Sequence, residues 1–348
     1  MNEKDITFYL PLSAYQLLER DRTTFQCGNH ISTMIKTILI NHYQAYNDSL
    51  LYFYHTFYKA MKRHDCSFTQ ASTQQYDAFA WDIYKNMYYN TLNQHLSIHM
   101  NEEKKKIHLR QNKHETVLDL ILDSIPFCAS QTEYLANIIY SYLDKPSYKR
   151  EQILYASILE KIQTAINEKH SIKIVTNTSH QRNHVPNKTH IIQPKEIVHS
   201  NEEIYNYLFY QEYHQKQAQW YANTIHLCNI LEVAYDAQPY QFTKEVEQFF
   251  NRMKCNGIQY SIHNDQTIKI QFTPKGLILF QLKYLERPLP LEPLSSTRDV
   301  YHFNCSIMQF YNYFSSFYDE ITILEPASLI EDVKALHQSI FQRYKTDE

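Results

Sequence analysis

The chain has 348 residues, which is enough for two or three domains rather than one compact unit. Its formal net charge is −3 at pH 7, so a protein that is basic overall is excluded, and nucleic-acid binding would depend on a local patch. With only 3 glycines, a glycine-rich phosphate-binding loop is excluded as well. The 6 cysteines form no C-x-x-C pair, as expected of core residues in a reducing cytosol. Because no signal core or bilayer-length apolar run is visible, we expect a cytoplasmic protein without membrane contact.

A first strand is predicted over residues 5–10, where apolar and polar residues alternate and Thr7 and Tyr9 face outward. Two helices follow, at 12–25 and 30–46, because apolar residues recur there at helical spacing. One strand followed by two helices resembles half of a ribbon-helix-helix unit. In that family two strands pair into an antiparallel ribbon that enters the major groove of DNA.

The same order is predicted a second time. A strand over 104–111 would place Lys106, His108 and Arg110 on one face and apolar residues on the other. The helices of this copy are expected over 115–125 and 131–142. We therefore predict a degenerate internal repeat, whose two strands pair either within the chain or each across a homodimer. Residues 49–103, between the copies, are predicted to be mostly helical and can be assigned no chemistry.

The middle of the chain changes from helical to β-rich patterning. Residues 146–168 are predicted to form one helix, and a strand is expected over 171–176. Short β-rich runs then alternate with turn-forming residues, which predicts a small, strongly bent sheet or barrel. These runs cover residues 189–192, 205–209 and 222–227.

The residue order within 189–235 resembles the WYL domain family. Pro194 is expected to end one strand, as a proline does in that family. The triplet Asn206-Tyr207-Leu208 stands where the family has Trp-Tyr-Leu, and Asn229-Ile230 stands where it has Arg-Ile. The resemblance implies a small Sm/SH3-like β-barrel with a surface groove for a nucleic acid or a small anionic ligand.

The groove departs from the family at one position. Because Asn229 carries no charge, basic residues on neighbouring strands would have to hold an anion in its place. The predicted groove residues are Lys173, Lys195, His199, Tyr207 and His226.

Strands and helices alternate again in the last third of the chain, which favours an α+β sandwich. The pairs Arg287-Pro288 and Glu325-Pro326 resemble the C-terminal extension that follows WYL domains, as does the spacing of Gln309, Tyr313 and Phe314. The resemblance implies a ferredoxin-like α+β fold that mediates homodimer contacts.

The predicted fold class is therefore α+β and multidomain. The predicted parts are a first ribbon-helix-helix half (1–48), a helical insertion (49–103), a second half (104–145), a connector helix (146–168), a WYL barrel (169–240) and an α+β extension (241–348).

The sharpest candidate site is the outward face of the ribbon, because potentially basic side chains on one strand face can reach phosphates or base edges. The predicted nucleic-acid-binding residues are Thr7, Tyr9, Lys106, His108 and Arg110. Catalytic, cofactor and metal sites are not predicted. His180, His184 and His190 lie close together, but neither a cysteine nor a helical H-x-x-x-H motif accompanies them.

The resemblance implies a non-catalytic regulatory protein that binds nucleic acid. WYL accessory proteins of type VI-D CRISPR systems share this build, bind single-stranded RNA and stimulate the RNA-guided RNase, and this is the function we expect. Single-stranded RNA or DNA, a CRISPR effector RNase and a second copy of the chain are the implied partners. The alternatives are a ligand-responsive DNA-binding transcription regulator and a structural partner whose ribbon serves only to dimerise.

Overall fold

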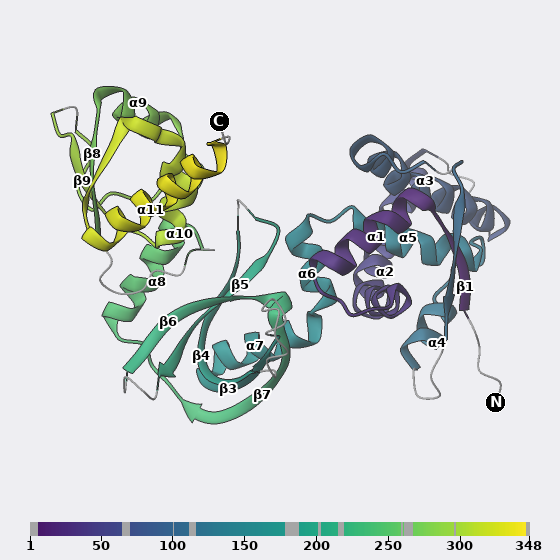
Figure 1. Ribbon diagram of the computed structural model, residues 1–348. Coiled ribbons are helices and arrows are strands. Elements are labelled where there is room, and N and C mark those ends of the chain that lie inside the picture. The colour runs from purple at the N-terminus through teal and green to yellow at the C-terminus, as the bar shows by residue number, and fades with distance from the viewer. Residues whose placement is uncertain are drawn as a thin grey trace. The chain divides into compact units, whose positions relative to one another are not determined.

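A computed structural model describes residues 6–64, 70–99, 101–110, 116–177, 188–200, 203–214, 219–258, 260, 267–295 and 297–345. The chain divides into two compact units, unit 1 (Met1–Leu159) and unit 2 (Glu160–Glu348), which are described separately below. Helices and several antiparallel sheets are both present, so the fold is multidomain α+β as predicted (Figure 1). None of the helices within the described residues is both long and apolar enough to cross a membrane.

Unit 1 contains a two-stranded antiparallel ribbon. β1 (Ile6–Pro11) pairs with β2 (Lys104–Leu109), so that Tyr9 lies opposite Lys106. Both strands belong to the same chain, which decides between the two pairings that the sequence left open. The inner face of the ribbon is buried and consists of Ile6, Phe8, Leu10, Ile107 and Leu109.

Helices follow each strand of the ribbon in the predicted order, β1–α1–α2 and β2–α4–α5. A turn at Gly28, whose φ of 78° favours glycine, separates α1 from α2. The helices of unit 1 are α1 (Leu12–Thr24), α2 (Ile31–His64), α3 (Gln70–Leu96), α4 (Thr116–Asp123), α5 (Gln131–Leu143) and α6 (Ser147–Leu154).

Two helix boundaries differ from the prediction. The helix expected to end near Tyr46 continues to His64, because its aromatic face packs against α3. The ring centroids of Tyr46 and Tyr84 lie 5.7 Å apart, and those of Phe53 and Tyr84 lie 5.3 Å apart. The single helix expected over 146–168 is two helices, α6 and α7 (Ala156–Glu168), which are separated at Tyr155.

A buried ion pair joins the first half of unit 1 to the helix that follows the second half. The Arg150 guanidinium of α6 donates to the Asp21 carboxylate of α1 at 2.7 Å, and both side chains are buried. The Tyr142 hydroxyl of α5 donates to the same oxygen at 3.0 Å. Burial raises the pKa of Asp21, and Arg150 and Tyr142 offset only part of that effect. The charge of Asp21 therefore depends on partners from the second half and from the helix that follows it.

A second polar contact joins α2 to α5. The Nε2 atom of the buried His42 lies 3.0 Å from the hydroxyl of Ser141. Burial lowers the pKa of His42 to about 4, and the nearby Lys145 ammonium adds to this effect. His42 is therefore neutral in the folded protein at neutral pH.

Unit 2 begins with a curved five-stranded antiparallel sheet in the order β6-β5-β4-β3-β7 (Figure 1). Its strands are β3 (His170–Thr176), β4 (Lys188–His199), β5 (Asn206–His214), β6 (Gln219–His226) and β7 (Ile230–Pro239). The short helix η1 (Leu227–Asn229) connects the two edge strands. Among the described residues no ladder joins β6 to β7, so the sheet is open where a closed barrel was predicted.

Pro194 does not end its strand, contrary to the prediction. β4 runs on to His199, and its pairing with β5 shifts between Pro194 and Glu196, which is a β-bulge. Proline cannot donate to a ladder, and a bulge lets the strand continue past it. Because of the bulge, Lys195 has no partner in the register between β4 and β5.

The rest of unit 2 is an α+β arrangement around a second sheet, of order β10-β8-β9. Phenylalanines dominate its core, including Phe272, Phe280, Phe303 and Phe314. The sequence also predicts a strand over residues 259–263, of which all but Tyr260 lie outside the described residues. The elements are α8 (Lys244–Asn256), β8 (Thr267–Phe272), α9 (Pro274–Leu282), β9 (Val300–Asn304), α10 (Ile307–Phe314), η2 (Ser315–Glu320), β10 (Ile321–Glu325) and α11 (Ala327–Tyr344).

Replacing Asp21 by Asn should lower the free energy of unfolding by about 3–5 kcal/mol, because it leaves the Arg150 charge buried without a partner. Urea denaturation of the full chain measures this. The double variant Asp21→Asn/Arg150→Met should recover part of the loss, since both buried charges are then gone. Glu19→Gln is the matched control, because it removes a more exposed pair with Arg22 on the same helix and should cost under about 1 kcal/mol. Equal losses in Asp21→Asn and Glu19→Gln would contradict the proposed role of the buried pair.

Acid should destabilise the protein through His42. Its folded-state pKa of about 4 lies below the ordinary histidine value, about 6.5, so the unfolded chain takes up the proton first. The stabilising contribution is complete above pH 6.5 and is lost as the pH falls toward 4, with a limit of about 3 kcal/mol. Urea titrations of wild type and His42→Gln at several pH values should show their difference in stability shrinking over this window. A difference that does not change with pH would disprove this assignment.

Candidate nucleic-acid interface

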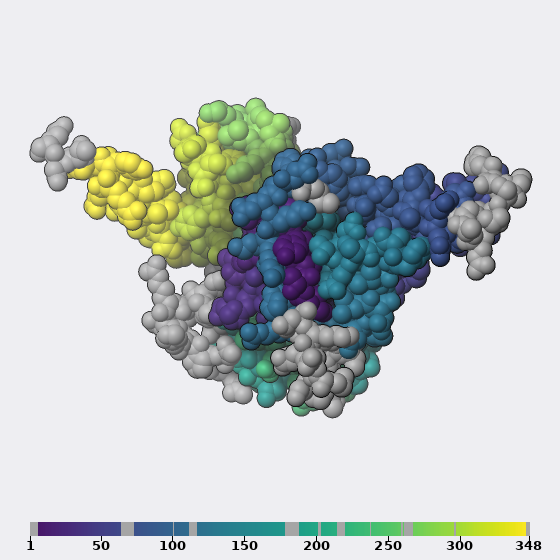
Figure 2. All heavy atoms as spheres, turned by 90° about the vertical axis from the view of Figure 1, so that its right-hand side faces the viewer, coloured from purple at the N-terminus to yellow at the C-terminus, as the bar shows by residue number. Residues whose placement is uncertain are grey.

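The outward face of the ribbon brings the predicted residues together. Because side chains alternate along a strand, Thr7 and Tyr9 of β1 lie on the same face as Lys106 and His108 of β2. The Thr7 hydroxyl is 3.2 Å from Nδ1 of His108 across the strands. Tyr9 is 44% exposed, which leaves much of its ring open to solvent. In Figure 2 the dark purple of β1 reaches the surface among the blue and teal atoms of unit 1.

The cations of the ribbon all come from the second strand and the residue that follows it. Lys104 and Lys106 are exposed, and Lys105 lies over the ring of Tyr15 with its Nζ 5.6 Å from the ring centre. Arg110 is also exposed, and its carbonyl oxygen accepts a hydrogen bond from Lys36 Nζ at 3.1 Å. Within the part of the chain that the structure describes, Lys104, Lys106 and Arg110 form no ion pair. Their charges are therefore available to a polyanion.

Two of the predicted groove residues do meet in unit 2. Tyr207 is buried, and its hydroxyl donates to the Glu203 carboxylate, so the contact with His226 Nε2 at 2.8 Å has the histidine as donor. The ring of Tyr205 stacks on His226, with centroids 4.5 Å apart. Phe209, on the same face of β5 as Tyr207, stacks on Phe250 of α8. The Tyr207 position is thus part of a hydrogen-bonded core rather than an open groove.

The other predicted groove residues are not brought to the same place. Lys195 donates to both oxygens of Glu247, at 2.6 and 2.5 Å, so its charge is already neutralised. Lys173 pairs with Ile191 on β4, whereas Tyr207 pairs with Val198 further along the same strand. That separation is roughly 20 Å at about 3.3 Å per residue. The five residues therefore do not line one groove.

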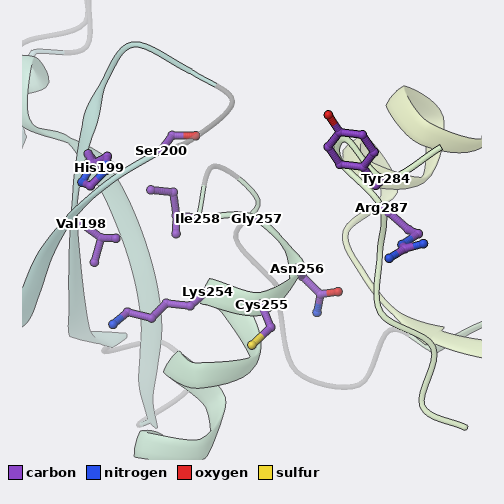
Figure 3. Close-up of a pocket in the computed structure, with 10 residues that line it drawn as sticks. All are labelled: Val198, His199, Ser200, Lys254, Cys255, Asn256, Gly257, Ile258, Tyr284 and Arg287. Carbon is purple, nitrogen blue, oxygen red and sulfur yellow. The ribbon is translucent and has the colours of Figure 1, made fainter. Parts of the chain in front are cut away.

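His199 lies instead in a pocket of about 350 Å³ that the sequence did not predict (Figure 3). The cationic side chains that line this pocket are Lys254 and Arg287. The Lys254 ammonium binds Glu196 at 2.6 Å and points toward the strands. Both polar atoms of the Asn256 side chain already form hydrogen bonds, because Nδ2 donates to the Asn304 carbonyl and Oδ1 accepts from the Leu289 amide. The C-terminal end of α8 also faces this pocket, and the partial negative charge there disfavours an anion.

Metal binding has no support within the described residues, where no suitable group of histidine, cysteine and acidic side chains occurs. Of the three histidines considered from the sequence, His180 and His184 lie outside the described residues. His190 lies 2.6 Å from the carboxylate of Glu212 and is paired in this way.

No known family model matches the sequence, and no curated protein matches it either. A solved structure described as a CRISPR Cas-related protein is similar to this chain with a TM-score of 0.69 and 16% identity, over 99% of this chain and 95% of that one. At this identity the likeness shows a shared fold. The proteasome accessory factor B/C (PafBC) of Arthrobacter aurescens also matches, with a TM-score of 0.29 and 15% identity, over 72% of this chain and 38% of that one. A TM-score that low supports no structural argument.

Replacing Tyr207 by Phe should lower the free energy of unfolding by about 1–3 kcal/mol, because His226 and Glu203 would lose their shared partner while the ring keeps its packing. Urea denaturation of the full chain measures the change. Tyr235→Phe is the matched control: this tyrosine is 54% exposed, and its change should stay within about 0.5 kcal/mol. If both variants unfold like wild type, the Tyr207 hydroxyl contributes nothing to the fold.

Proposed function

We propose that the chain is a non-catalytic, single-stranded-RNA-binding accessory protein that stimulates the RNA-guided RNase of a type VI-D CRISPR system. The observation that carries this proposal is the ribbon, whose two strands differ in charge. The cationic side chains Lys104 and Lys106 lie on β2, and the outward residues of β1, Thr7 and Tyr9, are uncharged.

A ribbon of this kind is poorly suited to a palindromic operator. Symmetric DNA sites mirror a protein two-fold axis, so both strands of a DNA-reading ribbon make equivalent contacts. Here the strands lie in one chain and carry different outward residues. One basic strand beside an exposed aromatic ring instead suits a single strand, which is held by phosphate contacts and base stacking.

The comparisons add support for a CRISPR setting. The protein whose fold is shared over almost the whole chain is described as CRISPR Cas-related. A shared fold alone leaves the activity open, so the RNA and the effector RNase are part of the proposal.

The proposal includes a homodimer formed through the C-terminal α+β part. Apolar side chains recur at helical spacing along the exposed second half of α11, at Leu336, Ile340 and Tyr344, and are 45%, 42% and 82% exposed. An exposed apolar stripe of this kind is typical of a protein interface. A second copy of the chain would cover it through a two-fold contact.

The runner-up function is a ligand-responsive DNA-binding transcription regulator. It is favoured by the arrangement of an antiparallel ribbon followed by two helices in each half, which is how one class of DNA-binding proteins presents its strands. The same binding experiment separates the two functions.

The double variant Lys106→Ala/Arg110→Ala should bind single-stranded RNA more weakly, by about 1 kcal/mol for each lost charge-assisted contact. Fluorescence anisotropy with single-stranded RNA, single-stranded DNA and duplex DNA at several salt concentrations measures this. Wild type should prefer single-stranded RNA. The plot of log affinity against log salt should flatten by about 0.7 per lost phosphate contact in the variant.

Lys195→Ala is the control for this experiment, because Glu247 already neutralises that lysine. It should bind RNA like wild type. Tighter binding to duplex DNA would favour the regulator, and unchanged RNA affinity in the double variant would remove the ribbon from the mechanism. A parallel assay of RNA cleavage by a type VI-D effector, with and without the chain, tests stimulation directly.

A further inference from the structure

A pocket of about 430 Å³ opens beside the outward face of the ribbon in unit 1. Tyr9 and Lys104 of the ribbon form part of its wall, so the pocket adjoins the proposed RNA path. Helices α3 and α5 supply most of the remaining wall, including Asn86, Tyr89, Asn137 and Tyr140.

The pocket exists because of α3, which has no counterpart in the repeated strand-helix-helix order. This helix is held against α5 by an ion pair between Lys85 and Glu133, at 3.3 Å. The rings of Trp81 and Tyr134, one from each helix, lie 6.3 Å apart. The insertion to which the sequence assigned no chemistry thus forms one wall of a cavity.

The charged side chains inside the pocket already form ion pairs with one another. Lys85 lies between Asp82, at 3.1 Å, and Glu133, at 3.3 Å. Glu133 also accepts hydrogen bonds from the amide and hydroxyl of Ser130, in the capping box of α5. Lys104 on the ribbon side forms no ion pair within the described part of the chain. The interior of the pocket therefore suits an uncharged group, and Lys104 at its edge suits a phosphate attached to that group.

The remaining wall offers amides and phenol rings. Asn137 is only 3% exposed, and its Nδ2 donates to the Glu133 carbonyl at 3.0 Å. A carbonyl can only accept, so this contact fixes the orientation of the amide. The other atom, Oδ1, is buried and accepts no hydrogen bond from the residues that the structure describes. That atom is also closed to solvent, so a ligand cannot reach it. Asn86, by contrast, is a partly exposed residue of the pocket wall and donates from Nδ2 to the Asp82 carbonyl at 2.8 Å, which leaves its Oδ1 as an acceptor for a ligand N–H.

We propose that this pocket receives one nucleobase of the RNA strand that follows the ribbon. The base lies between Tyr9 and Tyr89, an N–H on its edge faces Asn86, and its phosphate stays at Lys104. Single-stranded RNA permits this because its bases can be splayed out and stacked on aromatic rings, whereas duplex bases are already paired. The pocket volume lies within the range of sites that bind small molecules. The proposal rests on the RNA-binding function proposed above and adds a site of base preference to it.

The test fills the pocket. Asn86→Trp places a large ring in the cavity. The matched control is Asn90→Trp, which lies one turn further along the same helix, is exposed and does not line the pocket. Anisotropy with homopolymer RNA 12-mers of A, C and U compares them. Asn86→Trp should lose about tenfold in affinity for the preferred homopolymer, as expected for one stacked base, and should no longer discriminate among the three. Asn90→Trp should match wild type.

Two further arms separate failure of the pocket from failure of RNA binding. Wild-type affinity and base preference in Asn86→Trp, with weak binding in Lys106→Ala/Arg110→Ala, would overturn the pocket and leave the ribbon function standing. Should the chain bind no RNA, calorimetry with free nucleoside monophosphates decides: binding that Asn86→Trp abolishes keeps the pocket as a nucleotide site, and no binding overturns it. If circular dichroism shows that Asn86→Trp is unfolded, Tyr89→Ala replaces it, since it removes a wall instead of filling the space.

Discussion

The ion pair between Asp21 and Arg150 is the constraint on which unit 1 depends. It connects α1, from the first strand-helix-helix half, to α6, which follows the second, and Tyr142 of α5 completes it. A buried pair of this kind tolerates only a narrow geometry, because either charge alone would be costly to bury. Holding these helices together keeps an apolar surface beneath Phe8 and Ile107. The outward face of the ribbon is defined by that inner contact.

The regular elements of unit 1 follow from local sequence patterns. Alternation of apolar and polar residues predicted β1 and β2, and helical spacing predicted α1, α4 and α5 to within a few residues. The full length of α2 did not follow, because its second part is held by aromatic contacts with α3, which are tertiary. The interruption at Tyr155 has the same origin, since the Tyr155 hydroxyl donates to the carbonyl of Phe25 at 2.6 Å.

The candidate site also combines features that local sequence patterns predict with features that depend on tertiary contacts. The ribbon residues could be predicted because strand alternation fixes which side chains share a face, and the register then sets Tyr9 against Lys106. The groove predicted in unit 2 is not formed by its predicted residues, because contacts from α8 are tertiary: Glu247 neutralises Lys195, and Phe250 covers the sheet beside Tyr207. The pocket beside the ribbon could not be predicted from any short stretch of sequence, because its residues come from segments far apart in the chain.

Covalent linkage of the two ribbon strands has a consequence for how the protein behaves on dilution. Thr7 and His108 are 101 positions apart in one polypeptide, so the pairing of β1 with β2 needs no encounter between molecules. A ribbon assembled from two chains comes apart when the protein becomes scarce, whereas this one persists in a single molecule. The proposed self-association through α11 would then vary with cellular abundance while each copy keeps a complete ribbon.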